Sequence, residues 1–463
     1  MCSRTAHAAA RLALAGSLLL LTGCGGEQGA DGRPDLVLVI IDTWRWDAFG
    51  ANGAARPELT PQLDALAAGG VRFSRAIASS PWTLTSVASL LTGHYPTVHG
   101  AYGRYKKLSS IRAQVPMLAE LLAAEGYATA AVINNPFLEA HFGFDRGFDT
   151  YDYAPASNLD ARRAGPSVDA ALDLLGEADA KRPVFLLLHL FDPHLSYDPP
   201  PPWDHRWTGD YRGSLQPPLH PIKQIRSGSF APSPEDAVYL RALYDGEVGY
   251  ADQEMGRFFR ALNALRPGRE RMIVVTSDHG EEFGDHGGWE HGHTMYREQV
   301  QVPLIVVPPA SRPPRRGVVE TQIRLLDLFP TLLEAAGLSA PEAAPGRSLF
   351  PLMDDDADGD DRPAYSEREH LGEPAAAWRD GTHTLIAYPE QERLELFHTL
   401  EDPGETRDLS APEAERARAL EERLETLADL LERRAEELGP RAGESEIDPE
   451  LLDDLRSLGY VGD

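Results

Sequence analysis

The chain has 463 residues, of which 42% are hydrophobic and 25% are charged, and this composition excludes wholesale disorder. The length predicts one large domain together with a smaller one. A formal net charge of -28 argues against nucleic acid as a partner, because proteins that bind phosphate backbones carry an excess of Lys and Arg. The two cysteines, Cys2 and Cys24, lie near the N-terminus, which excludes a disulfide framework or a Cys-rich zinc site in the folded body.

The N-terminal segment predicts export. Arg4 and Arg11 flank the start of an apolar run, residues 12–21, that is too short to span a bilayer comfortably. The run ends in Leu21-Thr22-Gly23-Cys24, which resembles the lipobox of bacterial lipoproteins. This resemblance implies a signal peptide over residues 1–23, lipid on Cys24, a tether over 24–34 and anchoring to a bacterial membrane, facing the periplasm or the cell exterior. The alternative is a plain secretory signal with an incidental cysteine.

Continuous apolar runs after the tether predict strands that are buried on both faces. They cover residues 36–41, 128–133, 184–188, 272–275 and 302–307. Helical patterns separate several of them, as at 61–68, 117–125 and 234–265. The alternation predicts an α/β fold in which a mostly parallel sheet lies between helices, with the site beyond the carboxyl ends of the strands.

The residues after the last apolar run predict a second, smaller unit. The acidic run 354–361 is typical of a solvated linker, because it lacks the spacing and the closing Glu of an EF-hand calcium loop. We therefore divide the chain into a catalytic domain over 35–353 and a C-terminal α+β subdomain over 362–463. The subdomain has strand candidates at 385–388 and 394–397 and an amphipathic helix over 411–438. A Pro-rich stretch, 197–233, predicts a loop insertion near the mouth of the site.

A short helix is expected to carry the nucleophile. Apolar residues recur at helical spacing after Thr83, and Gly93 and Pro96 end the pattern. Thr83 would then lie at the helix N-terminus, where free N–H groups and the helix dipole favour an anion. Its hydroxyl could attack an anionic ester there. The alternative is that Thr83 is only an N-cap residue.

Three metal ligands are predicted at the same edge of the sheet. Asp42 follows the first apolar run directly, and Asp278 and His279 follow the run that ends near residue 276. Two carboxylates and one imidazole, completed by the hydroxyl of Thr83, would form a mononuclear site for a divalent metal. The imidazole favours zinc or manganese over calcium.

Several motifs resemble the sulfatase family of the alkaline phosphatase superfamily. They are Ile41-Asp42-Thr43-Trp44-Arg45-Trp46-Asp47, Leu90-Leu91-Thr92-Gly93-His94-Tyr95-Pro96, Asp192-Pro193-His194, Ser277-Asp278-His279-Gly280-Glu281, His291-Gly292-His293-Thr294-Met295-Tyr296 and the ending Leu455-Arg456-Ser457-Leu458-Gly459-Tyr460-Val461. The resemblance implies an alkaline-phosphatase-like fold and a metal-dependent hydrolase or transferase acting on anionic sulfate or phosphate esters.

Departures from the family's pattern shift the expected substrate. Sulfatases carry a Cys or Ser that becomes formylglycine, in a Cys/Ser-x-Pro-Ser-Arg motif, whereas this chain has Thr83 there and Val87 in place of the Arg. Threonine cannot be converted to formylglycine, and Ser79-Ser80-Pro81 lies too early in the chain. A threonine here resembles the phosphate-transferring relatives, including phosphodiesterases. A true sulfatase and a catalytically dead, surface-anchored binding protein are the alternatives.

Four histidines complete the candidate site. By the resemblance, His194 and His293 are expected to contact substrate or act as general acid. We expect His189, inside an apolar run, to be structural and His291 to face solvent. A second metal held by Asp192, His194 and His293 stays open, although the spacing of two-zinc relatives is not reproduced.

Overall fold

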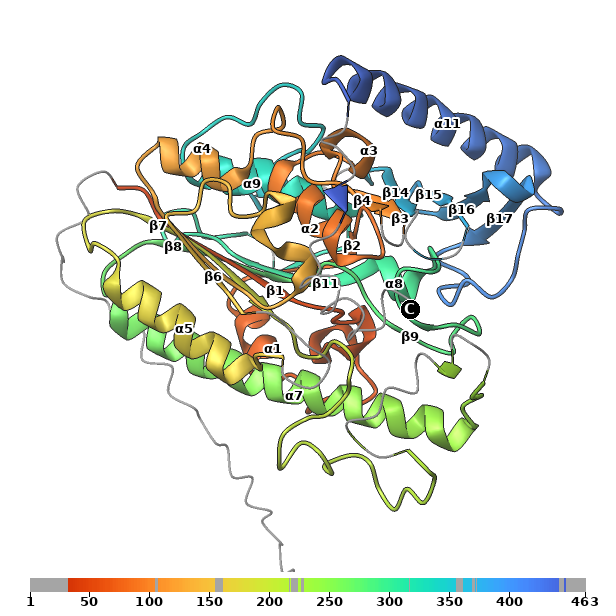
Figure 1. Cartoon of the computed structure of the whole chain (residues 1–463), viewed down its shortest axis with the longest axis horizontal. Helices are drawn as coiled ribbons and strands as arrows, with labels where there is room; N and C mark the ends of the chain where they lie inside the picture. The colour runs from red at the N-terminus through yellow and green to blue at the C-terminus, as the bar shows by residue number, and fades with distance from the viewer. Residues whose placement is uncertain are drawn as a thin grey trace, which may run out of the picture.

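The computed structural model describes residues 32–440 and 445–446, apart from gaps at 105–106, 155–160, 216, 218–223, 226–228, 316, 355–360, 369–370 and 372. Its centre is a sheet in which nine described strands lie side by side between helices (Figure 1). The order is β12 (Val318–Val319), β2 (Val71–Ile77), β11 (Gln301–Val307), β8 (Arg271–Thr276), β1 (Asp35–Ile41), β7 (Val184–Leu190), β5 (Ala128–Ile133) and β6 (Thr150–Tyr153), with β13 (Ile323–Arg324) also paired to β2. The predicted signal peptide, the lipobox and the C-terminal motif lie outside the described residues.

The prediction of a mostly parallel sheet is confirmed. β1 runs parallel to β7 and β8, β5 runs parallel to β6 and β7, and β12 and β13 run parallel to β2. β11 is antiparallel to both of its neighbours, β8 and β2. Each of the five apolar runs forms one of these strands.

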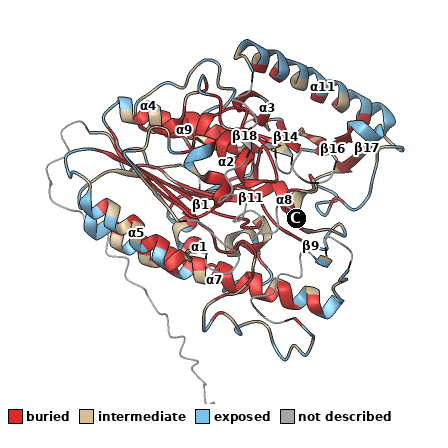
Figure 2. Cartoon of the chain, in the orientation of Figure 1, coloured by how far each residue is buried: buried red, intermediate tan, exposed pale blue. Residues whose placement is uncertain are grey.

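The central strand β1 explains why these runs are continuously apolar. Successive side chains of a strand point to opposite faces, and both faces of this sheet are covered by helices. Leu36, Leu38 and Ile40 pack into the core on one face, which contains α2 (Thr83–Thr92), α4 (Leu118–Ala124) and α9 (Leu328–Ala335). Val37, Val39 and Ile41 pack against α1 (Pro61–Ala68), α5 (Ala164–Glu177) and α7 (Pro234–Leu265) on the other. Figure 2 shows the buried interior between these two layers.

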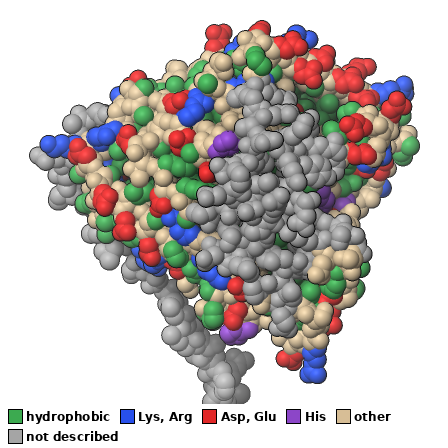
Figure 3. Space-filling view, in the orientation of Figure 1, with side chains coloured by type: hydrophobic (Ala, Val, Ile, Leu, Met, Phe, Trp, Pro, Cys, Tyr) green, Lys and Arg blue, Asp and Glu red, His purple; other side chains and the backbone are tan. Residues whose placement is uncertain are grey.

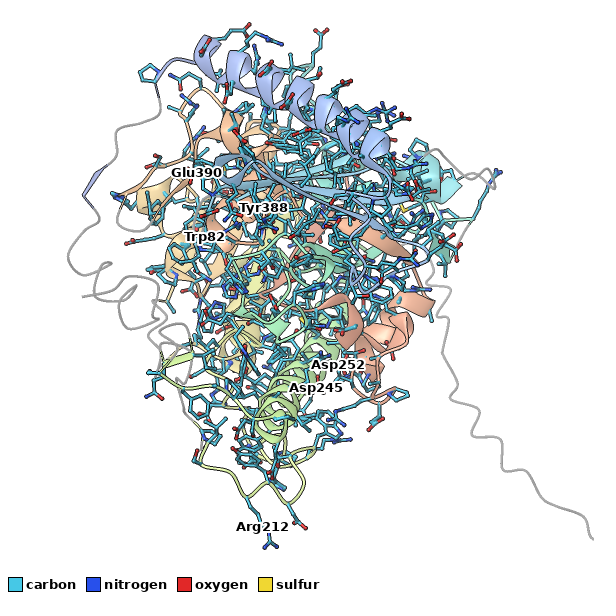
Figure 4. The ribbon with its side chains drawn as sticks, turned by 90° about the vertical axis from the view of Figure 1, so that its right-hand side faces the viewer. Trp82, Arg212, Asp245, Asp252, Tyr388 and Glu390 are labelled. Atoms are coloured by element: carbon cyan, nitrogen blue, oxygen red, sulfur yellow. The ribbon has the colours of Figure 1, made fainter. Side chains whose placement is uncertain are left out.

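The register of the central strands places the site. Ile41 of β1 pairs with Leu190 of β7, and Ile40 pairs with Thr276 of β8. These three parallel strands therefore end at nearly the same level. Asp42 and Asp278, which follow two of the strands, lie at this carboxyl edge. Figure 4 labels Trp82, the residue before α2, on the left of the molecule, with Asp245 and Asp252 of α7 below it and to the right.

The C-terminal part is built on a separate four-stranded antiparallel sheet. Its strands are β14 (Ala364–Arg368), β15 (Ala375–Arg379), β16 (His383–Tyr388) and β17 (Arg393–His398). The long helix α11 (Ala414–Glu437) packs Leu420 against Leu385 and Leu396 of this sheet. The helix begins later than predicted, because the carboxylate of Asp408 accepts the N–H groups of Leu396 and Ser410 and holds the preceding residues in a turn. Acidic side chains gather over α11 at the upper right of Figure 3.

The two sheets are joined by hydrogen bonds just before α2. The N–H of Glu367 donates to the carbonyl of Ser79 (3.0 Å), and the hydroxyl of Ser366 donates to the carbonyl of Ala78 (2.6 Å). The carboxylate of Glu367 also accepts the N–H of Thr97 (2.7 Å). β14 thus supports the segment that leads into α2. No described helix is both long and apolar enough to cross a membrane.

Candidate metal and nucleophile site

The helix that carries the candidate nucleophile forms as expected. Thr83 is the first residue of α2, while the N-cap is Trp82, whose backbone is extended and whose side chain makes no capping hydrogen bond. The alternative interpretation of Thr83 as an N-cap is therefore wrong. Gly93 ends the helix with φ of 70°, and a Cβ there would lie 2.6 Å from the ring of Phe329, so only glycine fits.

The hydroxyl of Thr83 faces His279. Thr83 is fully buried, and its Oγ1 lies 3.1 Å from Nε2 of His279. The other ring nitrogen of His279, Nδ1, lies 3.0 Å from the carbonyl of Gly280. Because a carbonyl can only accept, Nδ1 carries the hydrogen and Nε2 presents its lone pair toward Thr83. That lone pair can accept the hydroxyl proton or bind a metal.

The three predicted metal ligands lie together. Asp42, Asp278 and His279 are fully buried, and one ligand atom from each lies within 4.8 Å of the others. His279 Nε2 is 3.7 Å from Asp42 Oδ1 and 3.4 Å from Asp278 Oδ2. Neither of those two carboxylate oxygens accepts a hydrogen bond within the described residues. Since buried, unpaired carboxylates are costly, this donor set fits a divalent cation.

The electrostatics of the two carboxylates differ. Burial raises the pKa of Asp42, but the facing imidazoles of His194 and His189 outweigh it and bring the pKa to about 2. Burial, followed by the negative charge of Asp42, raises the pKa of Asp278. The two side chains therefore repel each other in a site with little solvent. A bound cation would neutralise both of them.

A group of imidazoles surrounds this cluster. The ring of His194 packs 4.5 Å from Phe191 and 5.0 Å from His291, and burial lowers its pKa. The ring of His291 in turn lies 4.4 Å from that of His279, and its Nδ1 is 3.0 Å from the buried carboxylate of Glu281. His291 is 1% exposed, so the prediction that it faces solvent is wrong. The contact with Glu281 holds the ring of His291 inside the site.

His189 also lies closer to the chemistry than expected. Its Nε2 is 3.5 Å from Asp42 Oδ2, and it is fully buried. The register places it opposite Ile40, so its side chain alternates with those of the apolar core residues and points toward the end of β1. His189 is therefore surrounded by apolar residues in the sequence but lies beside a carboxylate in the structure.

The other candidates for a second metal are engaged elsewhere. The Nε2 of His293 lies 3.0 Å from the carboxylate of Glu282, and its Nδ1 lies 3.2 Å from the carbonyl of His291. The carboxylate of Asp192 accepts the N–H of Ala164 at 2.6 Å. Within the part of the chain that the structure describes, the cluster with metal-binding geometry is Asp42, Asp278 and His279.

Two features of the site were not expected from the sequence. Asn135 donates from Nδ2 to Asp42 Oδ2 (2.7 Å), and the polar pair Asn134-Asn135 directly after β5 was the signal that could have indicated it. Thr43 has φ of 55°, which is strained for a β-branched residue, and its carbonyl accepts the hydroxyl of Tyr244 (2.8 Å). Strain of this kind concentrates at functional sites.

Comparison with known proteins identifies the family. The model of the sulfatase family matches residues 34–338, and that of the N-sulphoglucosamine sulphohydrolase C-terminal region matches residues 284–430. The chain belongs to the sulfatase family. This sulfatase-family protein is 24% identical to an arylsulfatase of Clostridium perfringens over 70% of its own length and 79% of that protein's. It thereby falls within the alkaline phosphatase superfamily.

Two further relatives are not named as sulfatases. The multifunctional alkaline phosphatase superfamily protein PehA of Trinickia caryophylli is 25% identical over 69% of this chain and 77% of PehA. The structure of the phosphonate monoester hydrolase of Agrobacterium radiobacter superposes with a TM-score of 0.69, covering 86% of this chain and 96% of that one at 20% identity. The alkaline-phosphatase-like fold is thereby confirmed, and the family match, the arylsulfatase and the phosphonate monoester hydrolase place the chain among hydrolases that act on ester bonds.

Proposed function

We propose that this sulfatase-family protein is a metal-dependent hydrolase of phosphate esters in which unmodified Thr83 is the nucleophile. The observation that carries the proposal is the hydroxyl of Thr83, buried at the first turn of α2 and 3.1 Å from His279 Nε2. The uncapped N–H groups of that turn and the helix dipole stabilise negative charge beside the hydroxyl. An anionic ester is therefore the class of substrate that suits the site.

The side chains divide the work of the reaction. Thr83 attacks the substrate through its hydroxyl oxygen. The hydroxyl proton is released to water, because the lone pair of His279 Nε2 is committed to the metal. A divalent metal held by Asp42, Asp278, His279 and Thr83 would lower the pKa of the hydroxyl and neutralise substrate oxygens. Both carboxylates carry a free oxygen for this role. Zinc and manganese suit the mixed carboxylate and imidazole set better than calcium.

His194 is proposed to take part in proton transfer to the oxygen of the leaving group. Its Nδ1 lies 3.0 Å from the carbonyl of Leu195 and therefore carries a hydrogen. The opposite nitrogen, Nε2, would have to bind a proton before it could donate one to the leaving-group oxygen. The corresponding role of His293 stays a prediction, because Glu282 and the carbonyl of His291 already contact its ring nitrogens.

The preference for phosphate rests on the nucleophile. Attack by Thr83 leaves a phosphothreonine that water can hydrolyse. A sulfated threonine would lack the route of release open to a formylglycine hydrate, which expels sulfate by elimination. The phosphonate monoester hydrolase of Agrobacterium radiobacter, which has the same fold, is by its name an enzyme that acts on a phosphorus ester, and this supports the preference.

Sulfate ester hydrolysis is the second candidate function. The match to the sulfatase model over residues 34–338 and the arylsulfatase relative favour it. A catalytically dead binding protein is disfavoured, because it would have no need for two buried carboxylates next to a buried hydroxyl, each with one oxygen that accepts no hydrogen bond within the described residues. We further propose that lipid on Cys24 anchors the exported protein to a membrane.

An ester screen tests the proposed function. Wild type, Thr83→Ala and Thr83→Ser are assayed with aryl phosphate monoester, phosphodiester, phosphonate monoester and sulfate ester substrates. We expect phosphate hydrolysis that Thr83→Ala abolishes and Thr83→Ser retains in part, with phosphothreonine trapped at Thr83 by peptide mass spectrometry. Thr92→Ala is the matched control, since it removes a buried hydroxyl from the other end of α2. Formylglycine at Ser79 or Ser80, with sulfatase activity that survives Thr83→Ala, would overturn the proposal.

A further inference from the structure

Asn135 occupies a fixed position at the carboxyl edge of the sheet. It follows β5 and is the N-cap of the 3-10 helix Pro136–Leu138, where its Oδ1 accepts the N–H of Phe137 at 2.9 Å. It is fully buried. Because the amide oxygen is committed to the cap, the amide nitrogen must face the opposite direction.

That nitrogen faces both the metal cluster and the nucleophile. Nδ2 donates to Asp42 Oδ2 at 2.7 Å and lies 3.5 Å from Thr83 Oγ1. An amide nitrogen has two hydrogens, one for each of these oxygens. The second contact is long, as catalytic hydrogen bonds often are before substrate is bound.

The bond to Asp42 also selects which of its oxygens is available to a metal. Asn135 engages Oδ2, while Oδ1 has no hydrogen-bond partner in the described structure and lies 3.7 Å from His279 Nε2. The carboxylate plane is thereby fixed with its free oxygen toward the other two ligands. This arrangement needs a donor at Asn135, and an acceptor in its place would repel Asp42.

The neighbouring asparagine, Asn134, forms its hydrogen bonds with other groups than Asp42 and Thr83. Asn134 donates from Nδ2 to Ser167 Oγ (3.0 Å) and to the carbonyl of His189, and its Oδ1 accepts from Arg162 Nε (2.6 Å). The end of β5 is thereby tied to β7 and α5. Asn134 offers a control that is buried and hydrogen-bonded but contacts neither Asp42 nor Thr83.

We propose that Asn135 is a catalytic residue that orients Asp42 and donates a hydrogen bond to Thr83 Oγ1 as negative charge develops on that oxygen. The inference rests on the proposed function, in which Thr83 attacks the ester. The same donor would act again when water hydrolyses the intermediate, because Thr83 Oγ1 is then the leaving oxygen. Preorganised donors of this kind cost no reorganisation during the reaction.

The test uses substitutions that keep the cap and remove the donor. Asn135→Ser retains a capping oxygen but has no amide, and Asn135→Asp retains the cap but places a carboxylate beside Asp42. We expect Asn135→Ser to lower kcat about 10- to 100-fold on the best substrate of the screen, with KM little changed, which is the loss typical of one donor to a charged oxygen. Asn135→Asp should lose more, and its metal content should fall.

The controls separate this inference from the proposed function. Metal content and Tm are measured for each variant, and we expect Asn134→Ser to lower Tm while kcat stays close to wild type. Wild-type kcat in Asn135→Ser at full metal occupancy, or complete recovery with added metal, would overturn the role at Thr83. If Thr83→Ala retained wild-type activity, the proposed function would fail and this inference with it. If Thr83→Ala were inactive while Asn135→Ser stayed fully active, the role of Asn135 would be wrong and the proposed function would stand.

Discussion

At the scale of single residues, the site is defined by two buried carboxylates that are only partly hydrogen-bonded by the described residues. Asp42 and Asp278 are fully buried, and each keeps one oxygen without a hydrogen bond in the described residues. Such an arrangement is stable only when a cation completes it or when one of the two acids stays protonated. Since the pKa of Asp278 is raised by burial and by the charge of Asp42, whereas that of Asp42 is lowered, Asp278 is the weaker acid of the two.

The substitution Asp278→Asn is therefore expected to weaken metal binding but to raise the thermal stability of the metal-free protein. The variant should bind less than stoichiometric metal by elemental mass spectrometry, since it lacks an anionic ligand. Without metal, it should have a higher Tm than wild type at pH values above the ordinary pKa of an aspartate, because an acid whose pKa is raised by folding destabilises the fold once it ionises.

The control for Asp278→Asn is Asp252→Asn on α7. Asp252 is also a buried acid, and burial raises its pKa to about 7. It accepts the N–H groups of Gln62 and Leu63 and is not part of the cluster of Asp42, Asp278 and His279. The metal content of the Asp252→Asn variant should match that of wild type. Full metal occupancy in Asp278→Asn would contradict the ligand assignment.

At the scale of elements, His286 links the hairpin of β9 (Glu282–Phe283) and β10 (Trp289–Glu290) to the C-terminal part. Its Nδ1 lies 2.7 Å from Glu298 Oε1, and its Nε2 donates to the carbonyl of Glu405 at 3.0 Å. Burial disfavours its charge, but the hydrogen bond to Glu298 outweighs this effect and raises the pKa to about 9. The ring also stacks on Tyr296 at 3.7 Å.

The raised pKa of His286 predicts a pH-dependent contribution to stability. Because the folded pKa exceeds the ordinary value of 6.5, the contribution is complete below pH 6.5 and is lost as pH rises through about 9. Thermal unfolding scans should show Tm falling more steeply over that window in wild type than in His286→Gln. Parallel profiles for the two proteins would contradict this assignment.

A second prediction at this scale concerns α11. Leu420 is 3% exposed and packs on Leu385 and Leu396, so Leu420→Ala should lower the free energy of unfolding by about 2–5 kcal/mol. Leu430 lies on the same helix but is 55% exposed, and Leu430→Ala should change it by less than about 0.5 kcal/mol. Chemical denaturation measures both. Equal effects of the two substitutions would show that α11 is not held by this core.

At the scale of the whole molecule, the first prediction concerns attachment. If Cys24 carries lipid, Cys24→Ser should leave the precursor unlipidated and release the protein from membrane fractions. Cell fractionation and intact-mass analysis measure both effects. A variant that stays in the membrane fraction with the wild-type mass shift would contradict the anchor.

Sequence patterns predicted most of the fold but only part of the site. Continuous apolar runs identify strands because covering helices demand apolar side chains on both faces, and residues that directly end such strands, as Asp42 does, meet at one edge by geometry. Asn135 was missed because its role depends on which way its amide is fixed by a cap. His291 was misplaced because its burial depends on Glu281, a partner ten residues away in a loop. Neither the cap at Asn135 nor the contact between His291 and Glu281 produces a periodic pattern in the sequence.

The hydrogen bonds from β14 to the carbonyls of Ala78 and Ser79 have a consequence for biosynthesis. A polypeptide emerges from the ribosome N-terminus first. The segment that leads into α2 therefore lacks its bonds to Ser366 and Glu367 until nearly four-fifths of the chain has been made. A nascent chain should consequently be inert toward esters up to that point, and premature termination before residue 366 should release a polypeptide in which the segment leading into α2 lacks these bonds.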